Sequence, residues 1–240
     1  MPSAEYQNLI ESIGQFKSDL MDFDPSPTIP YSNSNLLKCQ AFVVFSHAEM
    51  QVYWEAVARR ILLETERRWK SEGIAGRAIA ALVAFRKSEQ TSVPKDPYNP
   101  HDGGNFKVIV QGAIKSHSVV IDDNNGIKRA NIAQLLTPFG VMPEHFVETM
   151  LIQLDQTGKK RGDMVHKSSR VSIRTIRDPF ADEVGDIEGL VNEIGNFDLK
   201  LESIGLLSIP LSVPMAVAEN IAPSISDVIL TATDVQSGNI

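Results

Sequence analysis

The stretch that decides the fold is SNLLKCQAFVVFSHAEMQVYWEAVARRILLETERRWKSE, residues 34–72. It contains neither proline nor glycine, the two residues that most often interrupt helices, so it predicts one long helix. Its second half is strongly charged, and we therefore expect the helix to pass from a buried environment into a partly exposed one. The apolar positions that can line its buried side are Leu37, Ala41, Val44, Ala48, Val52, Val57 and Ile61.

Helical periodicity also occurs on both sides of this stretch. Residues 4–20 space their apolar side chains by three and four, whereas the following DFDPSPTIPYSNSN segment is rich in turn-forming residues and predicts a connector. FKVIVQGAIKSHSVVI has the β-branched content of a strand, but its helical neighbours favour a helix. Further helices are predicted in IAGRAIAALVAFRKS, RANIAQLLTPFG, PEHFVETMLIQLDQTG and DPFADEVGDIEGLVNEIGNFDLKLESIG.

These patterns predict an all-α protein, with one bundle of about five to seven helices over residues 1–208. The last segment, residues 209–240, has a different composition: it contains no Lys, Arg or aromatic residue and three prolines. It predicts a weakly ordered tail, with a helper strand or a partner-binding segment as the alternative.

Composition places the chain among ordinary soluble globular proteins, with 42% hydrophobic and 22% charged residues. The single cysteine, Cys39, excludes an internal disulfide and is interpreted as a small buried hydrophobic residue. The N-terminus is acidic and amphipathic, unlike a signal peptide, and no apolar run has the length of a membrane span. We therefore expect a cytoplasmic protein without membrane partners.

The charge of the chain is unevenly distributed. The net charge is −7, yet the segment 159–177 contains seven basic residues and one acid, Asp163, which gives it a local charge of +6. A basic patch on an acidic body can select phosphates without binding every polyanion. The alternative is a solvated loop and helix face. The basic residues are Lys159, Lys160, Arg161, Lys167, Arg170, Arg174 and Arg177.

Within this segment, TGKKRGDMVHKSS holds Arg161 and His166 with four residues between them. In a regular helix these two side chains would lie roughly 140° apart and would not share a face. Gly158 and Gly162, however, predict that the helix is interrupted here.

Asp163 is then expected to cap a new helix that begins just after it. Arg161 would lie in the turn and His166 in the first helical turn. Both could reach a phosphate at the new helix N-terminus, where backbone N–H groups also point. The alternative interpretation of His166 is a structural histidine at a helix end.

An all-helical chain with an Arg-x4-His pair late in the sequence resembles the HEPN superfamily, in which Arg-x4-6-His is the ribonuclease signature. The order of segments is most similar to the RiboL-PSP-HEPN group. In that comparison FVVFSHAEMQVYWEAVARRI resembles the long early helix, GIKRANIAQLLTPFGVMPEHFVETMLIQL precedes the motif, and ADEVGDIEGLVNEIGNFDLKL follows it. The resemblance covers residues 4–205. It departs at Gly162, where the family often has Asn, Asp or His.

The resemblance implies a metal-independent endoribonuclease that works as a homodimer, with the two Arg-x4-His turns facing each other. Arg161 and His166 would be the catalytic residues, and Asp163 a candidate supporting residue. A toxin or phage-defence role, with an antitoxin or regulatory partner, is implied in the same way. Lys159, Lys160, Lys167 and Arg170 are the candidate RNA-binding residues.

Other polar residues lie outside the Arg-x4-His segment. Glu49 is a candidate to face and orient Arg161 or His166, with a surface position as the alternative. His47 lies two residues before it, so the two side chains point about 200° apart and do not form a pair. His117 and His145 are interpreted as structural. No cluster with metal-ligand spacing accompanies His101, so neither a metal nor a cofactor is expected.

Two other functions remain open at this point. The first is a non-catalytic HEPN-like module that binds RNA, a nucleotide or a protein partner, and the second is a plain helical scaffold. An RNA-cleavage assay separates the enzyme from both. Salt-dependent RNA binding separates the binding module from the scaffold.

Overall fold

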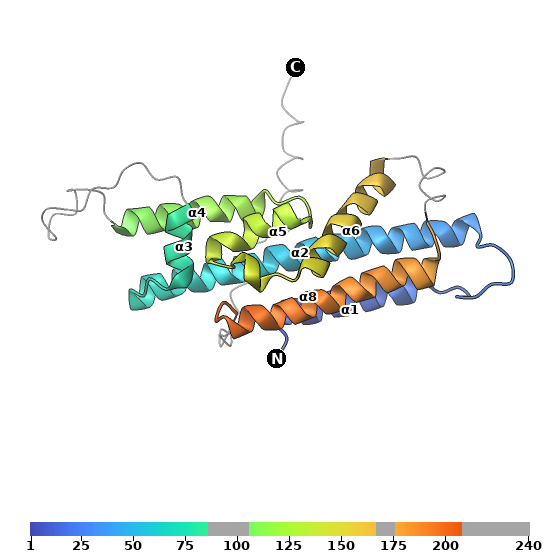
Figure 1. Cartoon of the computed structure of the whole chain (residues 1–240), viewed down its shortest axis with the longest axis horizontal. Coiled ribbons are helices and arrows are strands. Elements are labelled where there is room, and N and C mark those ends of the chain that lie inside the picture. Colours follow the sequence, from blue (N-terminus) through green and yellow to red (C-terminus); the bar gives the residue numbers. More distant parts are fainter. Residues whose placement is uncertain (86–105, 167–175, 208–240) are drawn as a thin grey trace, which may run out of the picture. The chain divides into compact units, whose positions relative to one another are not determined.

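A computed structural model describes residues 1–85, 106–166 and 176–207 (Figure 1). These residues form seven α-helices and no strand, which confirms the predicted all-α class. By its contacts the chain divides into Met1–Ser208 and Ile209–Ile240; the expected tail lies outside the described residues. The helices are α1 (Ala4–Leu20), α2 (Asn33–Glu72), α3 (Arg77–Phe85), α4 (Phe106–Asp122), α5 (Arg129–Leu136), α6 (Glu148–His166) and α8 (Gly185–Ser203). Two 3-10 turns, η1 (Thr137–Phe139) and η2 (Pro143–His145), and a π-helix, η4 (Pro179–Val184), complete the elements.

Helix α2 is the long helix predicted from the sequence, and the other elements pack around it. Its N-cap is Ser32, whose hydroxyl accepts a hydrogen bond from the backbone N–H of Asn35 at 3.1 Å. Gly73 ends it in the left-handed conformation (φ 67°), which glycine adopts without strain. In Figure 1, α1 and α8 follow one side of α2, α4 and α5 lie on the other, and α6 crosses α2 at a steep angle and also contacts α8. Helix α2 therefore forms the centre of the core.

The buried face of α2 differs from the predicted one. Val57 and Ile61 are buried as expected, but Leu37, Ala48 and Val52 are exposed. The larger aromatic side chains lie on another side of the helix and remove more apolar surface from water, so they decide which side faces the core. The buried residues of α2 are Cys39, Phe42, Val43, Ser46, His47, Met50, Tyr53, Trp54, Val57, Ala58, Ile61 and Leu62.

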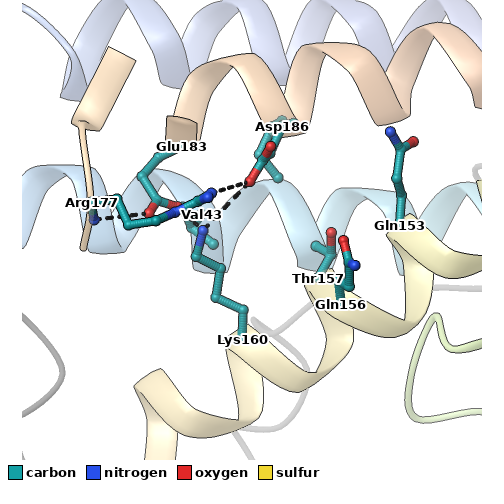
Figure 2. Close-up of a pocket in the computed structure, with 9 residues that line it drawn as sticks. Val43, Gln153, Gln156, Thr157, Lys160, Arg177, Glu183 and Asp186 are labelled. Carbon is teal, nitrogen blue, oxygen red and sulfur yellow. Dashed lines mark hydrogen bonds and ion pairs between the residues drawn. The ribbon is translucent and has the colours of Figure 1, made fainter. Parts of the chain in front are cut away.

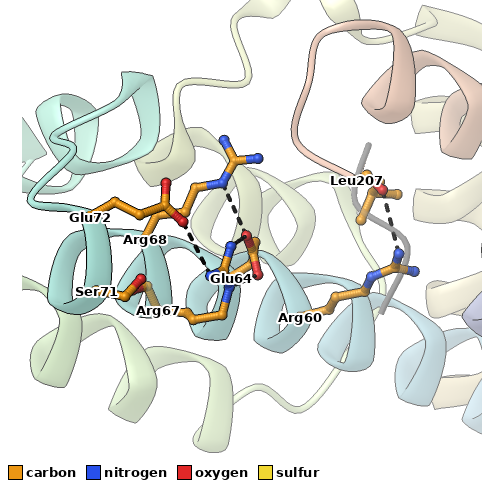
Figure 3. Close-up of polar contacts among 7 residues, drawn as sticks. All are labelled: Arg60, Glu64, Arg67, Arg68, Ser71, Glu72 and Leu207. Atoms are coloured by element: carbon orange, nitrogen blue, oxygen red, sulfur yellow. Dashed lines mark hydrogen bonds and ion pairs between the residues drawn. The ribbon is translucent and has the colours of Figure 1, made fainter. Parts of the chain in front are cut away.

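The charged second half of α2 is stabilised by ion pairs along its own surface (Figure 3). Glu64 accepts hydrogen bonds from Arg67 at 2.7 Å and from Arg68 at 3.0 Å. Arg67 also reaches Glu72 at 3.2 Å. The two pairs of Glu64, three and four residues apart, each add only a few tenths of a kcal/mol. These ion pairs give Arg67 and Arg68 internal counter-charges, so neither arginine is free to bind a ligand.

A buried carboxylate joins the N-terminus of the chain to α8. Asp198 accepts hydrogen bonds from the backbone N–H of Ser3 at 2.7 Å, from its hydroxyl at 2.6 Å and from the Tyr53 hydroxyl at 2.9 Å. The charged acceptor strengthens each of these bonds. Ser3 also caps α1, so one cluster fixes α1, α2 and α8 together.

Helix α6 does not end where the sequence predicted. PEHFVETMLIQLDQTG was expected to form one helix ending before Gly158, but Pro143 lies in the 3-10 turn η2, and α6 continues through both glycines to His166. Glycine costs about 1 kcal/mol in a helix interior, and tertiary packing overrides that preference here. Gly158 is buried, and the Gln40 side chain of α2 donates a hydrogen bond at 3.2 Å to the Met164 carbonyl in the last turn.

None of the helices in the described part of the chain combines the length and apolar character needed to cross a membrane.

Candidate functional site

The continuous α6 separates the two motif residues. Arg161 and His166 are five residues apart on a regular helix, so their side chains point roughly 140° apart. Asp163 lies inside the helix and does not cap a new one, so the predicted phosphate site at a helix N-terminus is wrong. His166 is exposed in the last described turn, whereas Arg161 and Asp163 are half-buried. One copy of this helix cannot aim both motif side chains at one phosphate.

Arg161 is distinguished from the other described arginines by its lack of a partner. Seven arginines in the described ranges each make a hydrogen bond or an ion pair, whereas Arg161 makes neither. A half-buried cation without a counter-charge is costly, and proteins normally pair such groups. The guanidinium of Arg161 is therefore available to an external anion. The paired arginines are Arg59, Arg60, Arg67, Arg68, Arg77, Arg129 and Arg177.

A second cation lies on the same face of α6. Lys128, the residue before α5, crosses α6 at Gly158, where a Cβ atom would stand only 2.8 Å from the lysine Cγ. Only a glycine allows this close approach. Arg161 follows Gly158 by three residues, so the two positions are neighbours on the helix surface.

His47 of α2 lies close enough to both cations for their charges to act on its ring. Its side chain is buried, with the residue only 4% exposed, and it makes no hydrogen bond within the described part of the protein. Burial, together with the positive charges of Arg161 and Lys128, lowers the pKa of His47 from 6.5 to about 4. At neutral pH the imidazole is therefore uncharged. The sequence analysis had set His47 aside.

His47 should make the fold sensitive to acid. Its pKa is depressed in the folded chain, so the unfolded chain binds the extra proton more readily. The resulting stability is fully present above pH 6.5 and decreases as the pH falls from 6.5 to about 4. The full shift corresponds to about 3 kcal/mol. Urea unfolding at pH 7 and pH 4.5 would measure this loss, and His47→Phe should reduce the difference; an unchanged difference would contradict the assignment.

Lys160 points away from this cluster, into a polar cavity between α6, η4 and α8 (Figure 2). Its ammonium pairs with the carboxylate of Glu183, which is completely buried, and lies 3.8 Å from Asp186. Arg177 binds Asp186 at 2.7 Å. Lys160 thus joins α6 to the π-helix, and the candidate RNA-binding lysine is occupied by an internal partner.

The cavity has a volume of about 390 Å³, and most of the residues that line it are polar. Gln153, Gln156 and Thr157 line the end away from the ion pairs (Figure 2). The side-chain oxygen of Gln153 is buried and has no hydrogen-bond partner among the described atoms. The charges at the other end balance, with two cations facing two carboxylates, so the cavity has no preference for an anion.

The remaining candidate residues are only partly placed. Lys159 is exposed on α6, as a nucleic-acid contact would be. Glu49 is half-buried, and within the described ranges no hydrogen bond or ion pair joins it to Arg161 or His166. Lys167 and Arg170 lie outside the described residues.

Sequence reasoning missed Lys128, His47 and Glu183. Each is brought to α6 from a distant part of the chain, so no local spacing reveals it. One signal for His47 was available: it lies four residues after Val43 and three before Met50, which places it on their side of the helix. A histidine on that face is a buried one.

Comparisons with protein-family models, with curated proteins and with solved structures find no match for this chain. Within the described residues, no three His, Cys, Asp or Glu side chains gather as metal ligands would.

Proposed function

We propose that the chain is an RNA-binding endoribonuclease that cleaves RNA through its 2′-OH group, with Arg161 and His166 as the catalytic residues. The observation that carries this proposal is the half-buried guanidinium of Arg161, which has no partner among the described residues. The exposed His166 and Lys159 on the same helix and the resemblance to the HEPN superfamily support it.

The site requires a second copy of the chain. Because Arg161 and His166 point about 140° apart on α6, one chain offers each phosphate only one of them. A two-fold homodimer with the ends of its α6 helices facing each other would place Arg161 of one copy opposite His166 of the other. This arrangement completes the site without any change in the helix.

The chemistry follows from the ordinary properties of the two side chains. As the 2′-oxygen of the ribose forms a bond to phosphorus, its proton passes to a neutral histidine. The bond from phosphorus to the 5′-oxygen breaks, and the leaving oxygen takes the proton back from the same His166, which became protonated in the first transfer. Arg161 holds two phosphate oxygens through its planar fork and stabilises the extra charge of the transition state.

RNA cleavage by the purified chain tests this proposal. We expect products with 2′,3′-cyclic phosphate and 5′-hydroxyl ends, no cleavage of DNA of the same sequence, and no effect of EDTA. Substrate RNA with 2′-O-methyl groups should bind but remain intact, because the nucleophile is blocked. Equal cleavage of the DNA, or loss of activity with EDTA, would contradict the mechanism.

The regular course of α6 favours a second candidate function. If the chain does not place Arg161 and His166 on one phosphate, it is a non-catalytic module that binds RNA or a nucleotide. Salt-dependent binding of intact RNA without cleavage would identify that function, with a slope that decreases when Lys159 or Arg161 is removed.

A further inference from the structure

We propose that Lys128 and Arg161 together bind one phosphate group near the buried imidazole of His47. The ligand class is a phosphodiester or a phosphate monoester. This inference rests on the proposed function in its choice of RNA as the source of the phosphate. It adds two residues, from α2 and from the segment before α5, that the Arg-x4-His pair does not include.

The position of Lys128 is fixed by contact with α6. Its side chain lies against the buried Gly158. Glycine has no Cβ atom, and this allows the side-chain carbons of the lysine to come so close to the helix. Arg161 is one turn further along the same face. The two cationic groups thus come from different elements and converge on one patch of α6.

Among the described residues, neither of these two cations forms an ion pair with an acid. Arg161 makes no hydrogen bond or ion pair anywhere in the described ranges. Asp155, one turn before Gly158, accepts hydrogen bonds from the Arg129 side chain at 2.8 Å and from the Arg129 backbone N–H at 2.9 Å. The charge of Lys128 also acts on this carboxylate and helps to lower its pKa. The hydrogen bonds of this carboxylate thus go to Arg129, and Lys128 acts on it only through its charge. Two neighbouring cations without an ion-pair partner fit a phosphate, because its oxygens can accept charge-assisted hydrogen bonds from both.

His47 reports on whether the phosphate is bound. It is the buried group on which the fields of Arg161 and Lys128 act, and the described structure places no other charged group with an effect on it. The two positive charges oppose protonation of the ring. A phosphate bound between them offsets their field, so binding should make His47 easier to protonate. A neutral ring near the cations also avoids a third positive charge at the site.

The test is an NMR titration of the His47 ring in the full-length protein, with inorganic phosphate compared to chloride at equal ionic strength. We expect phosphate to raise the pKa of His47 saturably. Arg161→Gln and Lys128→Gln should each raise the pKa of His47 without phosphate and weaken phosphate binding about tenfold or more, as expected for a lost charged hydrogen bond. Lys115→Gln, which removes an exposed cation on α4, is the matched control and should change neither quantity.

Two results would overturn the inference. One is an unchanged His47 titration in phosphate up to about 50 mM, a concentration that saturates even a millimolar site. The other is an Arg161→Gln or Lys128→Gln variant, folded by circular dichroism, with the wild-type pKa and phosphate affinity. A wild-type protein that passes this titration but leaves RNA intact would refute the ribonuclease proposal and keep the phosphate site. RNA cleavage by a protein whose His47 titration does not respond to phosphate would refute the phosphate site and keep the ribonuclease proposal.

Discussion

Arg161→Ala and His166→Ala should each reduce RNA cleavage by about 10²–10⁴, the contribution typical of a positioned acid–base group. Neither change should alter helical content or melting temperature much, because His166 is exposed and Arg161 makes no internal polar contact among the described residues. Arg161→Lys should fail as well, since lysine keeps the charge but loses the planar fork that grips two phosphate oxygens. The measurement is the single-turnover rate at saturating RNA, in nuclease-free preparations.

Lys115→Ala provides the control for this experiment, because it removes an exposed cation from a helix outside the site. It should cleave at the wild-type rate. Wild-type cleavage by His166→Ala would show that the histidine has no role in the chemistry. Unfolding of that variant would show that the histidine is structural.

Lys160→Ala should lower the free energy of unfolding by about 3 kcal/mol, because it leaves the buried Glu183 carboxylate without its cation. This value is at the low end for a broken buried pair, since 26% of the Lys160 side chain is exposed and water can approach. Lys159→Ala, one position earlier and exposed, should change stability by less than about 0.5 kcal/mol. Urea unfolding of the two variants gives the comparison.

A double variant separates the loss of the pair from the loss of packing. In Lys160→Met with Glu183→Leu, both charges are replaced by apolar groups of similar size, and much of the stability should return. Equal melting of Lys160→Ala and Lys159→Ala would mean that the ion pair with Glu183 does not form. The sequence analysis had treated the two lysines as equivalent RNA contacts, and this experiment tells them apart.

The sequence predicts the helices well where the apolar periodicity agrees with the residues that begin and end helices. Helices α1 and α2 lie close to the predicted ranges, residues 4–20 and 34–72, and the residues that cap α2, Ser32 and Gly73, act locally. In Gly185–Ser203, which lies within a predicted helix, Ile187, Leu190 and Ile194 recur at helical spacing and are buried. Local signals are sufficient where one helix has one clearly apolar side.

The errors arise where distant residues decide the outcome. Gly158 favours a helix end by its own propensity, but Lys128 packs against it and the helix continues. The same packing brings Lys128 near His47 and Arg161, residues from three separate parts of the chain. Lys160 was assigned to RNA because its buried partner, Glu183, comes from an element 23 residues away in sequence. Such pairings depend on the tertiary structure and have no signature in one sequence.

The central claim is that each catalytic site combines Arg161 of one chain with His166 of another. The most direct test mixes the inactive Arg161→Ala and His166→Ala proteins after partial unfolding and refolding, so that mixed dimers form. Half of the dimers would then be mixed, and each would contain one intact site, so about a quarter of the wild-type activity should return. Each variant refolded alone should stay inactive. Activity that does not rise on mixing, in a sample shown to contain mixed dimers, would contradict a site shared in this way between two chains.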